Sequence, residues 1–295
     1  MKFKTNKIVF LTIILITALL LPSNFLWKVE CSEGTEKLYL LGSVHIVPES
    51  VYPLNDVIEE AFERSDYLVV EADMKNLDIA KTQKFMMQQG LYLDGRNLET
   101  VLPAETYIKL TKAVDEIGMI PMMQLNMMQP WLVSLTLPQL MIVKQGFDPQ
   151  KGIDMHFLNK AQDSKKVLEL ESAEFQMELL SGFDEKTQIA MLENTLEELP
   201  EFSDRFDKMV GAWSSGNIEK MEKIIEDEHG KNKSLEIFYD KLITERNDSM
   251  TDKIVSYLES GDGKIYFVVA GSGHMIGKTG IVNQLKEKGY KITRL

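Results

Sequence analysis

Runs of apolar residues without polar alternation occur near both ends of the 295-residue chain. They are KLYLLG at 37–42, YLVV at 67–70 and IYFVVAG at 265–271. Such runs are typical of parallel strands that helices cover on both faces. Between the first two runs, apolar residues at helical spacing predict a helix near 54–64. The pattern therefore predicts a strand–helix–strand unit near the N-terminus.

The C-terminal part of the chain has the same pattern. After the run at 265–271, we predict a helix near 280–288 and a last strand in YKITRL at 290–295. In both units the first strand ends in Gly-x-x-His, as Gly42–His45 and Gly271–His274. The two units indicate an α/β fold with a small, mostly parallel sheet built from two related strand–GxxH–helix–strand halves.

The middle of the chain is predicted to be mostly helical, with one short strand in KKVLELES at 165–172. A helix is expected at 122–144 with breaks at Pro130 and Pro138, and the last helix is expected to start at Ser234 as N-cap. The remaining helices are expected at 77–89, 104–117, 153–162 and, in several pieces, 173–259. We interpret 37–295 as a single domain with a helical insertion at about 76–260.

The first residues differ from the rest. Three lysines in MKFKTNK precede the apolar run IVFLTIILITALLL at 8–21, which is the pattern of an export signal. No A-x-A cleavage site follows, and Cys31 follows KVE, a poor lipidation signal. Residues 1–31 are therefore interpreted as either a cleaved signal peptide or a retained membrane anchor. In both cases the domain is expected to be extracytoplasmic, secreted or anchored to the outer face of the cytoplasmic membrane.

Charge and cysteine content narrow the classes of function. The formal net charge is -12, which argues against nucleic acid and anionic lipid headgroups as partners, so membrane contact is expected only through the N-terminal segment. Cys31 is the only cysteine, which excludes an intramolecular disulfide and a thiolate nucleophile in the domain. Nothing in the pattern indicates an oligomeric state.

Polar residues follow the predicted strands at the edge where parallel sheets bind ligands. They are His45, Glu71, Glu171 and His274. Two imidazoles with one or two carboxylates suit a divalent Mn, Co, Zn or Fe ion. Gly42 and Gly271 allow a sharp exit from each strand and close backbone approach to a bound group.

Other candidates have simpler interpretations. His156 lies in a predicted helix and is expected to pack on its face, whereas Asp154, in the first turn of that helix, is a second candidate for the site. His229 is expected at the surface, and Arg246 fits an ordinary surface ion pair. The methionine-rich segment 119–131 is typical of an adaptable core or a peptide-binding groove.

Taken together, these motifs resemble the TraB/PrgY/GumN family, which includes the Tiki proteins. The resemblance covers about Lys37 to Leu295 and includes LYLLGSVHIVPESVYPL, YLVVEAD, ERNDSM and VVAGSGHMIGKTG. It implies a fold similar to erythromycin esterase and the haem-binding ChaN proteins. The family's two GxxH motifs correspond to Gly42–His45 and Gly271–His274, its acidic strand end to Glu71, and its helix motif to Arg246-Asn247. The chain lacks the cysteine framework of the animal ectodomains.

The resemblance implies metal-dependent hydrolysis, of the peptidase type, of a peptide or protein substrate. On this interpretation His45, His274 and Glu71 hold a divalent metal ion. Glu71 or Glu171 acts as general base, and Arg246 stabilises an oxyanion or binds a substrate carboxylate. Two alternatives stay open. One is a metal-independent, esterase-like hydrolase in which Glu71 orients His45 as base, and the other is a non-catalytic protein that binds a peptide or haem in a methionine-lined groove.

Overall fold

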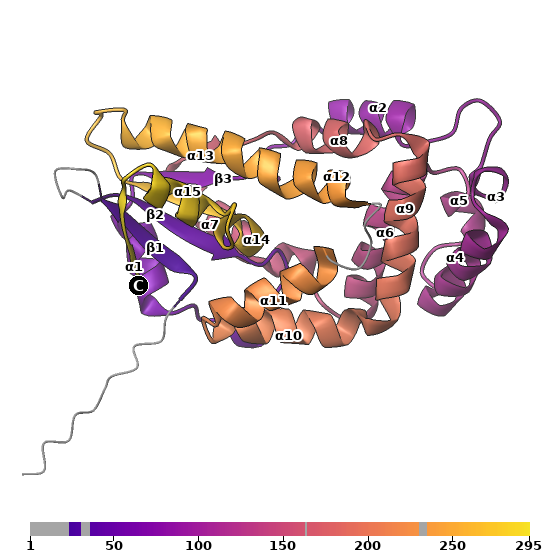
Figure 1. Ribbon diagram of the computed structural model, residues 1–295, viewed down its shortest axis with the longest axis horizontal. Helices are drawn as coiled ribbons and strands as arrows, with labels where there is room; N and C mark the ends of the chain where they lie inside the picture. Colours follow the sequence, from indigo (N-terminus) through magenta and orange to yellow (C-terminus); the bar gives the residue numbers. More distant parts are fainter. Residues whose placement is uncertain (1–23, 31–35, 163, 230–234) are drawn as a thin grey trace, which may run out of the picture.

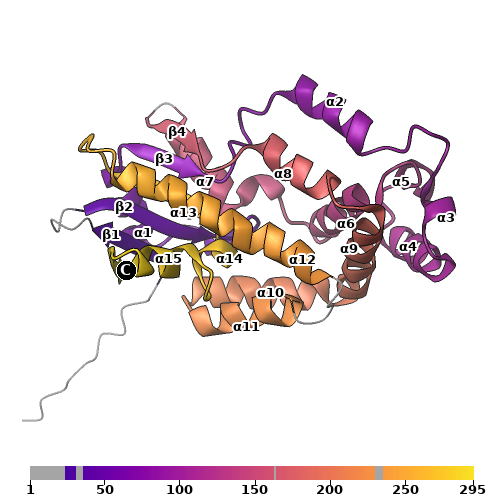
Figure 2. The same cartoon turned by 45° about the horizontal axis from the view of Figure 1, so that its top comes forward.

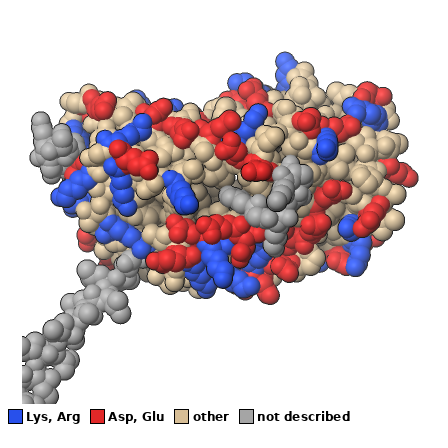
Figure 3. Space-filling view, viewed as in Figure 1, with Lys and Arg blue, Asp and Glu red and all other residues tan. Residues whose placement is uncertain are grey.

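The computed structural model describes residues 24–30, 36–162, 164–229 and 235–295 (Figure 1). Residues 1–23 of the predicted export segment therefore lie outside the described residues. Cys31 and the predicted N-cap Ser234 also lie outside them. Within the described ranges, no helix is long and apolar enough to span a membrane. Over the face shown in Figure 3, basic and acidic side chains are interspersed, and acidic ones are prominent along one helix, α11 (Ile218–His229).

A six-stranded sheet forms one end of the molecule, with the strand order β4-β3-β5-β2-β1-β6. The strands β2, β5, β3 and β4 pair in parallel, while β1 pairs antiparallel with both β2 and β6. The α/β class with a mostly parallel sheet is confirmed. The strands are β1 (Leu26–Glu30), β2 (Glu36–Ser43), β3 (Tyr67–Val70), β4 (Lys166–Glu169), β5 (Tyr266–Gly271) and β6 (Lys291–Arg294).

Strand β1 corrects the predicted boundary at residue 31. Residues 26–30 were assigned to the export segment, yet Leu26 and Val29 are fully buried in the sheet core. Trp27 pairs with Leu40 of β2 and, on the other side, with Arg294 of β6. This strand joins β6 to the rest of the sheet, so the domain includes residues well before 37.

The side chains of β5 alternate between two helical layers. Phe267 contacts Phe62 and Phe157, with ring centroids 5.6 and 4.9 Å away, while Tyr266 stacks on Tyr257 at 5.0 Å. Successive strand residues point to opposite faces, so these contacts place α1 and α7 on one face and α13 on the other. Figures 1 and 2 show α13 and α15 together over that second face. These helices are α1 (Asp56–Arg64), α7 (Ile153–Ala161), α13 (Glu245–Leu258) and α15 (Ile281–Glu287).

The helical insertion forms a lobe beside the sheet, with its own apolar core (Figure 1). Its helices are α2 (Ile79–Gln89), α3 (Leu98–Val101), α4 (Ala104–Ile117), α5 (Met122–Leu125), α6 (Pro130–Lys144), α8 (Ala173–Ser181) and α9 (Glu185–Glu198). The predicted break at Pro130 is confirmed, because α6 begins there. The predicted break at Pro138 is wrong, because this proline lies inside α6.

The helices that follow α9 lie between the lobe and the sheet. Helix α10 (Phe202–Ser214) reaches the sheet edge, where the Trp213 indole N–H donates to the Gly42 carbonyl at 2.6 Å. Helix α11 packs along α10. Helix α12 (Glu236–Tyr239), the π-helical η5 (Asp240–Thr244) and α13 run on without a break from the lobe to the sheet (Figure 2).

Candidate functional site

The two GxxH motifs lie side by side at the carboxyl edge of the sheet. Strands β2 and β5 are parallel neighbours, with Ser43 in register with Gly271. His45 follows β2 by two residues, and His274 lies in α14 (Ser272–Met275), which begins as β5 ends. A Cβ atom at Gly42 would lie only 3.0 Å from the Ser272 hydroxyl oxygen, so a glycine at this position lets α14 approach β2 closely.

The His45 ring is oriented through its Nδ1 atom. Asp154 Oδ2 lies 3.0 Å from that nitrogen, and Asp154 Oδ1 accepts a hydrogen bond from the Ser43 hydroxyl at 2.8 Å. The His45 side chain projects into a cavity and keeps 69% of its area accessible. Asp154, together with Glu71, raises the pKa of His45 to about 9. The carboxylate therefore fixes the ring so that Nε2 faces outward.

Helix α7 brings Asp154 to His45 through a close backbone contact. Gly152, the residue before this helix, packs directly on the His45 carbonyl, and the Ile153 N–H donates to the Val44 carbonyl at 3.2 Å. A Cβ atom at Gly152 would lie 1.9 Å from the His45 carbonyl oxygen. Because no side chain fits in that space, this glycine positions α7 against the first GxxH motif.

His274 is buried and is oriented in the same way by an amide. The Asn247 side chain donates through Nδ2 to the Thr279 carbonyl at 2.9 Å, so its Oδ1 faces His274 Nδ1, 2.7 Å away. An oxygen at that position requires the Nδ1 atom of His274 to carry the proton, which leaves a lone pair on Nε2. Burial lowers the pKa of His274 below its ordinary value and favours this neutral form.

Glu71, at the end of β3, is the carboxylate nearest to His274. Its Oε1 accepts the Gly271 N–H at 2.5 Å, its Oε2 accepts Arg246 Nη2 at 2.9 Å, and His274 Nε2 lies 3.9 Å from Oε2. Burial alone raises the pKa of Glu71, but the neighbouring His274, His45 and Arg246 side chains and the Gly271 hydrogen bond outweigh it. The pKa of Glu71 therefore lies below its ordinary value, and the side chain is ionised at neutral pH.

Arg246 is buried between two carboxylates from neighbouring strand ends. Its Nε atom is 3.0 Å from both Glu171 oxygens, and its Nη2 atom is 2.8 Å from Glu171 Oε2. Its Nη1 atom donates to the Leu242 carbonyl in η5 at 3.0 Å. The interpretation of Arg246 as a surface ion pair is wrong, because only 8% of the residue is exposed. Its guanidinium donates to both Glu71 and Glu171.

The three candidate ligands all lie within 4 Å of the position that a Cβ atom on Gly271 would occupy. A Cβ atom built there would lie 3.3 Å from Glu71 Oε1, 3.7 Å from His274 Cδ2 and 3.8 Å from His45 Nε2. The glycine thus leaves open the space that these side chains share. Two imidazoles whose Nδ1 atoms are occupied and one ionised carboxylate are the donor types that suit a divalent cation. As the side chains stand, no group of three or more His, Cys, Asp or Glu in the described ranges is close enough to hold a metal ion.

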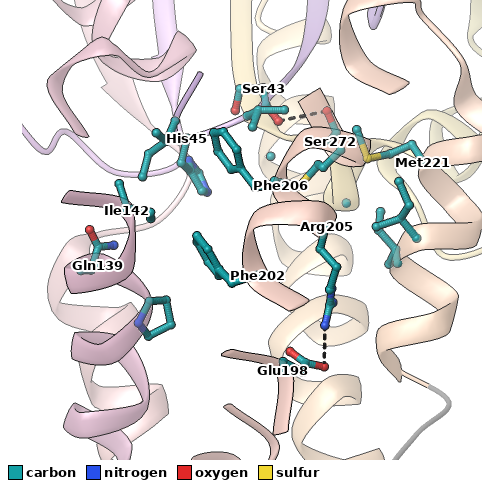
Figure 4. A pocket seen from close by; sticks show the side chains of 18 of the residues that line it. Ser43, His45, Gln139, Ile142, Glu198, Phe202, Arg205, Phe206, Met221 and Ser272 are labelled. Carbon is teal, nitrogen blue, oxygen red and sulfur yellow. Dashed lines mark hydrogen bonds and ion pairs between the residues drawn. The ribbon is translucent and has the colours of Figure 1, made fainter. Parts of the chain in front are cut away.

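An elongated cavity of about 500 Å³ adjoins this cluster. The sheet edge contributes His45, Gly271 and His274 to its lining, and the other walls come from α6, α9, α10, α11 and η5. Figure 4 shows His45 facing the same space as Phe206, with Phe202 further along. The methionine-rich segment 119–131 does not line this cavity.

The structure brings the predicted site residues together except for His156. His156 lies outside the cluster, where its Nε2 is 2.9 Å from Glu59 Oε1 and its ring contacts Tyr52. His229 was expected at the surface, and its side chain lies outside the described residues. The sequence analysis missed Ser43, Gly152 and Trp213, which support the first GxxH motif. Ser43 lies within that motif, but the other two carry no local signal.

The pKa of His45 gives a direct test of its contact with Asp154. We expect the imidazole to titrate near pH 9 in the metal-free protein, against an ordinary value of 6.5. Because folding raises this pKa, protonated His45 stabilises the fold below pH 6.5, and that contribution is lost as the pH rises through about 9. Asp154→Asn should return the titration toward the ordinary value, as followed by imidazole C–H signals in NMR spectra. Glu59→Gln, which alters the partner of His156, should leave it unchanged. An unshifted titration in Asp154→Asn contradicts the assignment.

Gly152 offers a second test. Gly152→Ala should lower the free energy of unfolding by about 1–3 kcal/mol, because the new methyl group must displace backbone. It should also disturb the His45 titration. The matched control is Gly211→Ala in α10, where nothing lies within 4 Å of the new Cβ. That change should stabilise the helix by up to about 1 kcal/mol. Equal stability of the two variants in urea unfolding would show that α7 does not depend on this contact.

Comparison of the sequence with known proteins identifies the family and several relatives. The sequence profile of the TraB/PrgY/gumN family matches residues 25–294. The uncharacterized protein YbaP of Escherichia coli (strain K12) is 26% identical over 255 residues, which cover 86% of this chain and 89% of YbaP. The metalloprotease TIKI homolog of Amphimedon queenslandica is 21% identical over 92% of this chain and 62% of its own length. Metalloprotease TIKI2 of Danio rerio is 22% identical over 92% and 60%. No solved structure matches the chain.

Proposed function

Because this chain belongs to the TraB/PrgY/gumN family, we propose that it is an exported, metal-dependent hydrolase of the peptidase type. The observation that supports the proposal most directly is the pair of GxxH histidines, whose Nδ1 atoms are held by Asp154 and Asn247 and which lie beside the same glycine as Glu71. The two distant relatives described as metalloproteases favour the same chemistry. A peptide or protein is the proposed substrate.

His45 Nε2, His274 Nε2 and the Glu71 carboxylate would hold the cation, which is a Mn, Co, Zn or Fe ion on chemical grounds. When bound, such an ion supplies Lewis acidity to a substrate carbonyl and to a water molecule. Asp154 and Asn247 act as positioning residues, because each fixes the ring of one histidine. Glu71 is better suited to bind a cation than to accept a proton, because its pKa is held low.

In this proposal Arg246 positions Glu71 and Glu171 instead of contacting the oxyanion. It holds both carboxylates in place, and it neutralises part of their charge where strands β3 and β4 end. Glu171 is then part of the support for Glu71, since its two oxygens are occupied by Arg246. The roles proposed from the sequence for Arg246 as oxyanion donor and for Glu171 as base are the less favoured ones on this geometry.

The test is metal analysis together with hydrolysis. Protein from residue 24 onward, purified without chelator, should contain about one equivalent of a divalent metal ion and should cleave peptides. Removing the ion with a chelator should stop cleavage, and adding back one of the four metals should restore it. Glu71→Gln distinguishes two roles, because loss of a ligand lowers metal content whereas loss of a base lowers only the rate. Cleavage at an unchanged rate in metal-free protein would contradict the proposal.

A metal-independent hydrolase is the second candidate, and the His45–Asp154 pair favours it. An exposed imidazole oriented by a carboxylate is the arrangement of a general base. The residue that orients His45 is Asp154, and not Glu71 as the sequence suggested. Because the pKa of His45 is about 9, this mechanism predicts chelator-resistant hydrolysis whose rate rises toward pH 9. The metal-dependent mechanism predicts that chelation abolishes the reaction at every pH.

A further inference from the structure

The cavity beside the histidines has apolar walls that the proposed chemistry does not require. Its sheet edge carries the polar cluster, but its helical walls are apolar over most of their length. None of these wall side chains is needed to hold a cation or to orient a histidine. They come from α6, α10 and α11 and include Ile142, Phe202, Phe206, Met221, Ile224 and Ile225.

Helix α10 sets the length of the apolar wall. Its C-terminal end is fixed at the sheet by the Trp213 hydrogen bond to Gly42, so residues nearer its N-terminus lie progressively further from the histidines. Met209, Phe206 and Phe202 all line the cavity. At a rise of about 1.5 Å per residue, the wall from Met209 to Phe202 is about 10 Å long. That length matches about three residues of an extended peptide.

The apolar wall ends at a charged pair. Arg205 Nη1 lies 3.0 Å from Glu198 Oε1, and both side chains line the cavity. Figure 4 shows this pair at the end of the cavity away from Ser43 and Ser272, with Phe202 beside it. The order along the cavity is therefore histidines, apolar wall, ion pair. Apolar contact is available only within about three residues of the bond that faces the histidines.

We propose that this cavity is a subsite for large apolar side chains of a peptide substrate. The subsite lies within about three residues of the cleaved bond, on one side of it only. Leucine, phenylalanine or methionine side chains gain free energy by leaving water for these walls. An aspartate or lysine there would be buried without a partner, which is strongly unfavourable. The proposal rests on the proposed function, because it takes the histidine cluster as the place where the bond is cleaved.

The experiment separates binding from cleavage. Two synthetic peptides of about eight residues share length and net charge, and one has leucine or phenylalanine at three successive positions where the other has serine or threonine. Binding is measured by calorimetry on His45→Ala protein, and cleavage by mass spectrometry on unchanged protein. We expect the apolar peptide to bind and to be cleaved at least about 10-fold better, because a single methylene group in an apolar pocket is already worth about 10- to 200-fold. The cleaved bond should lie at one end of the apolar stretch or within it.

Variants of the wall test where the peptide binds. Phe202→Glu places a charge in the apolar wall and should weaken binding of the apolar peptide at least tenfold. The matched control is Phe175→Glu on α8, which is 42% exposed and lies outside the cavity lining, and it should change nothing. Ile225→Glu provides the same test from α11 if Phe202→Glu does not fold.

The outcomes distinguish this proposal from the proposed function. Cleavage with no preference between the two peptides overturns the apolar subsite and leaves the hydrolase intact. Tight, Phe202-dependent binding of the apolar peptide without cleavage under any metal ion supports the subsite and contradicts the hydrolase. Binding of haem or a fatty acid in place of either peptide overturns the subsite as a peptide site.

Discussion

Replacing either GxxH histidine with alanine should abolish both metal binding and metal-dependent hydrolysis. His45 and His274 reach the same space around Gly271 from adjacent strands. Changing the hydrogen-bond partner of a ligand typically lowers metal affinity or activity about 10- to 100-fold. Loss of a ligand itself should lower both by far more. Because the two residues act as one unit, the double variant should be little worse than either single variant. Metal content and turnover of the three purified variants measure this directly.

His156→Ala is the matched control. His156 also pairs with a carboxylate, at 2.9 Å, but it lies outside the cluster and should leave metal content and turnover intact. The stability of each variant must be measured alongside its activity, so that loss of fold is not mistaken for loss of chemistry. Full metal binding and near-normal turnover in a well-folded double histidine variant would end the metallohydrolase proposal. A loss of stability with normal activity in the folded fraction would assign the histidines a packing role.

Replacing Arg246 with methionine should lower the free energy of unfolding by about 3–5 kcal/mol. The side chain fills the space between Glu71 and Glu171, and removing its charge leaves two buried carboxylates facing each other. Burial and the neighbouring Glu171 charge both raise the pKa of Glu71, and the Arg246 charge offsets them. Without the guanidinium, the pKa of Glu71 should therefore rise. The lost stability should therefore be partly recovered at low pH, where the carboxylates bind protons. Urea unfolding at several pH values measures both effects.

Arg96→Met is the control for this change. Arg96 also pairs with two carboxylates, Asp94 at 2.8 Å and Glu185 at 2.6 Å, but half of its side chain is exposed. An exposed pair contributes about 0–1 kcal/mol, so this variant should unfold almost like the unchanged protein. If Arg246→Met were as stable as Arg96→Met at neutral pH, Arg246 would not be what holds the two strand-end carboxylates together. The triple variant Arg246→Met, Glu71→Gln, Glu171→Gln should recover stability, because no buried charge remains.

Local sequence signals were sufficient for elements whose ends are marked nearby. Helix α4 spans Ala104–Ile117 as predicted, since Pro103 precedes it and Gly118 ends it with φ of 70°. Strands β3 and β5 were recognisable because each is a continuous apolar run. The convergence of His45 and His274 was also predictable, since both follow strands of one parallel sheet. The shared position of Glu71 follows from the same rule.

Strand β1 shows where such signals fail. Its apolar residues follow closely after the run of the export segment, so the sequence alone does not separate the two. What identifies Leu26–Glu30 as a strand is its pairing with β2 on one side and β6 on the other. The proline inside α6 is a similar case. A proline usually interrupts a helix, but the packing of α6 against α9 outweighs that preference here.

The sequence by itself determined the α/β class, the two strand-end histidines and the glutamate beside them, because these follow from local periodicity and from the common direction of parallel strands. Only the tertiary structure decided how that site is supported. Asp154 reaches His45 across 109 positions of sequence, and Arg246 reaches Glu71 across 175. These contacts exist because α7 and α13 cover opposite faces of one sheet. The local pattern of residues along the sequence carries no information about which distant side chains such packing brings together.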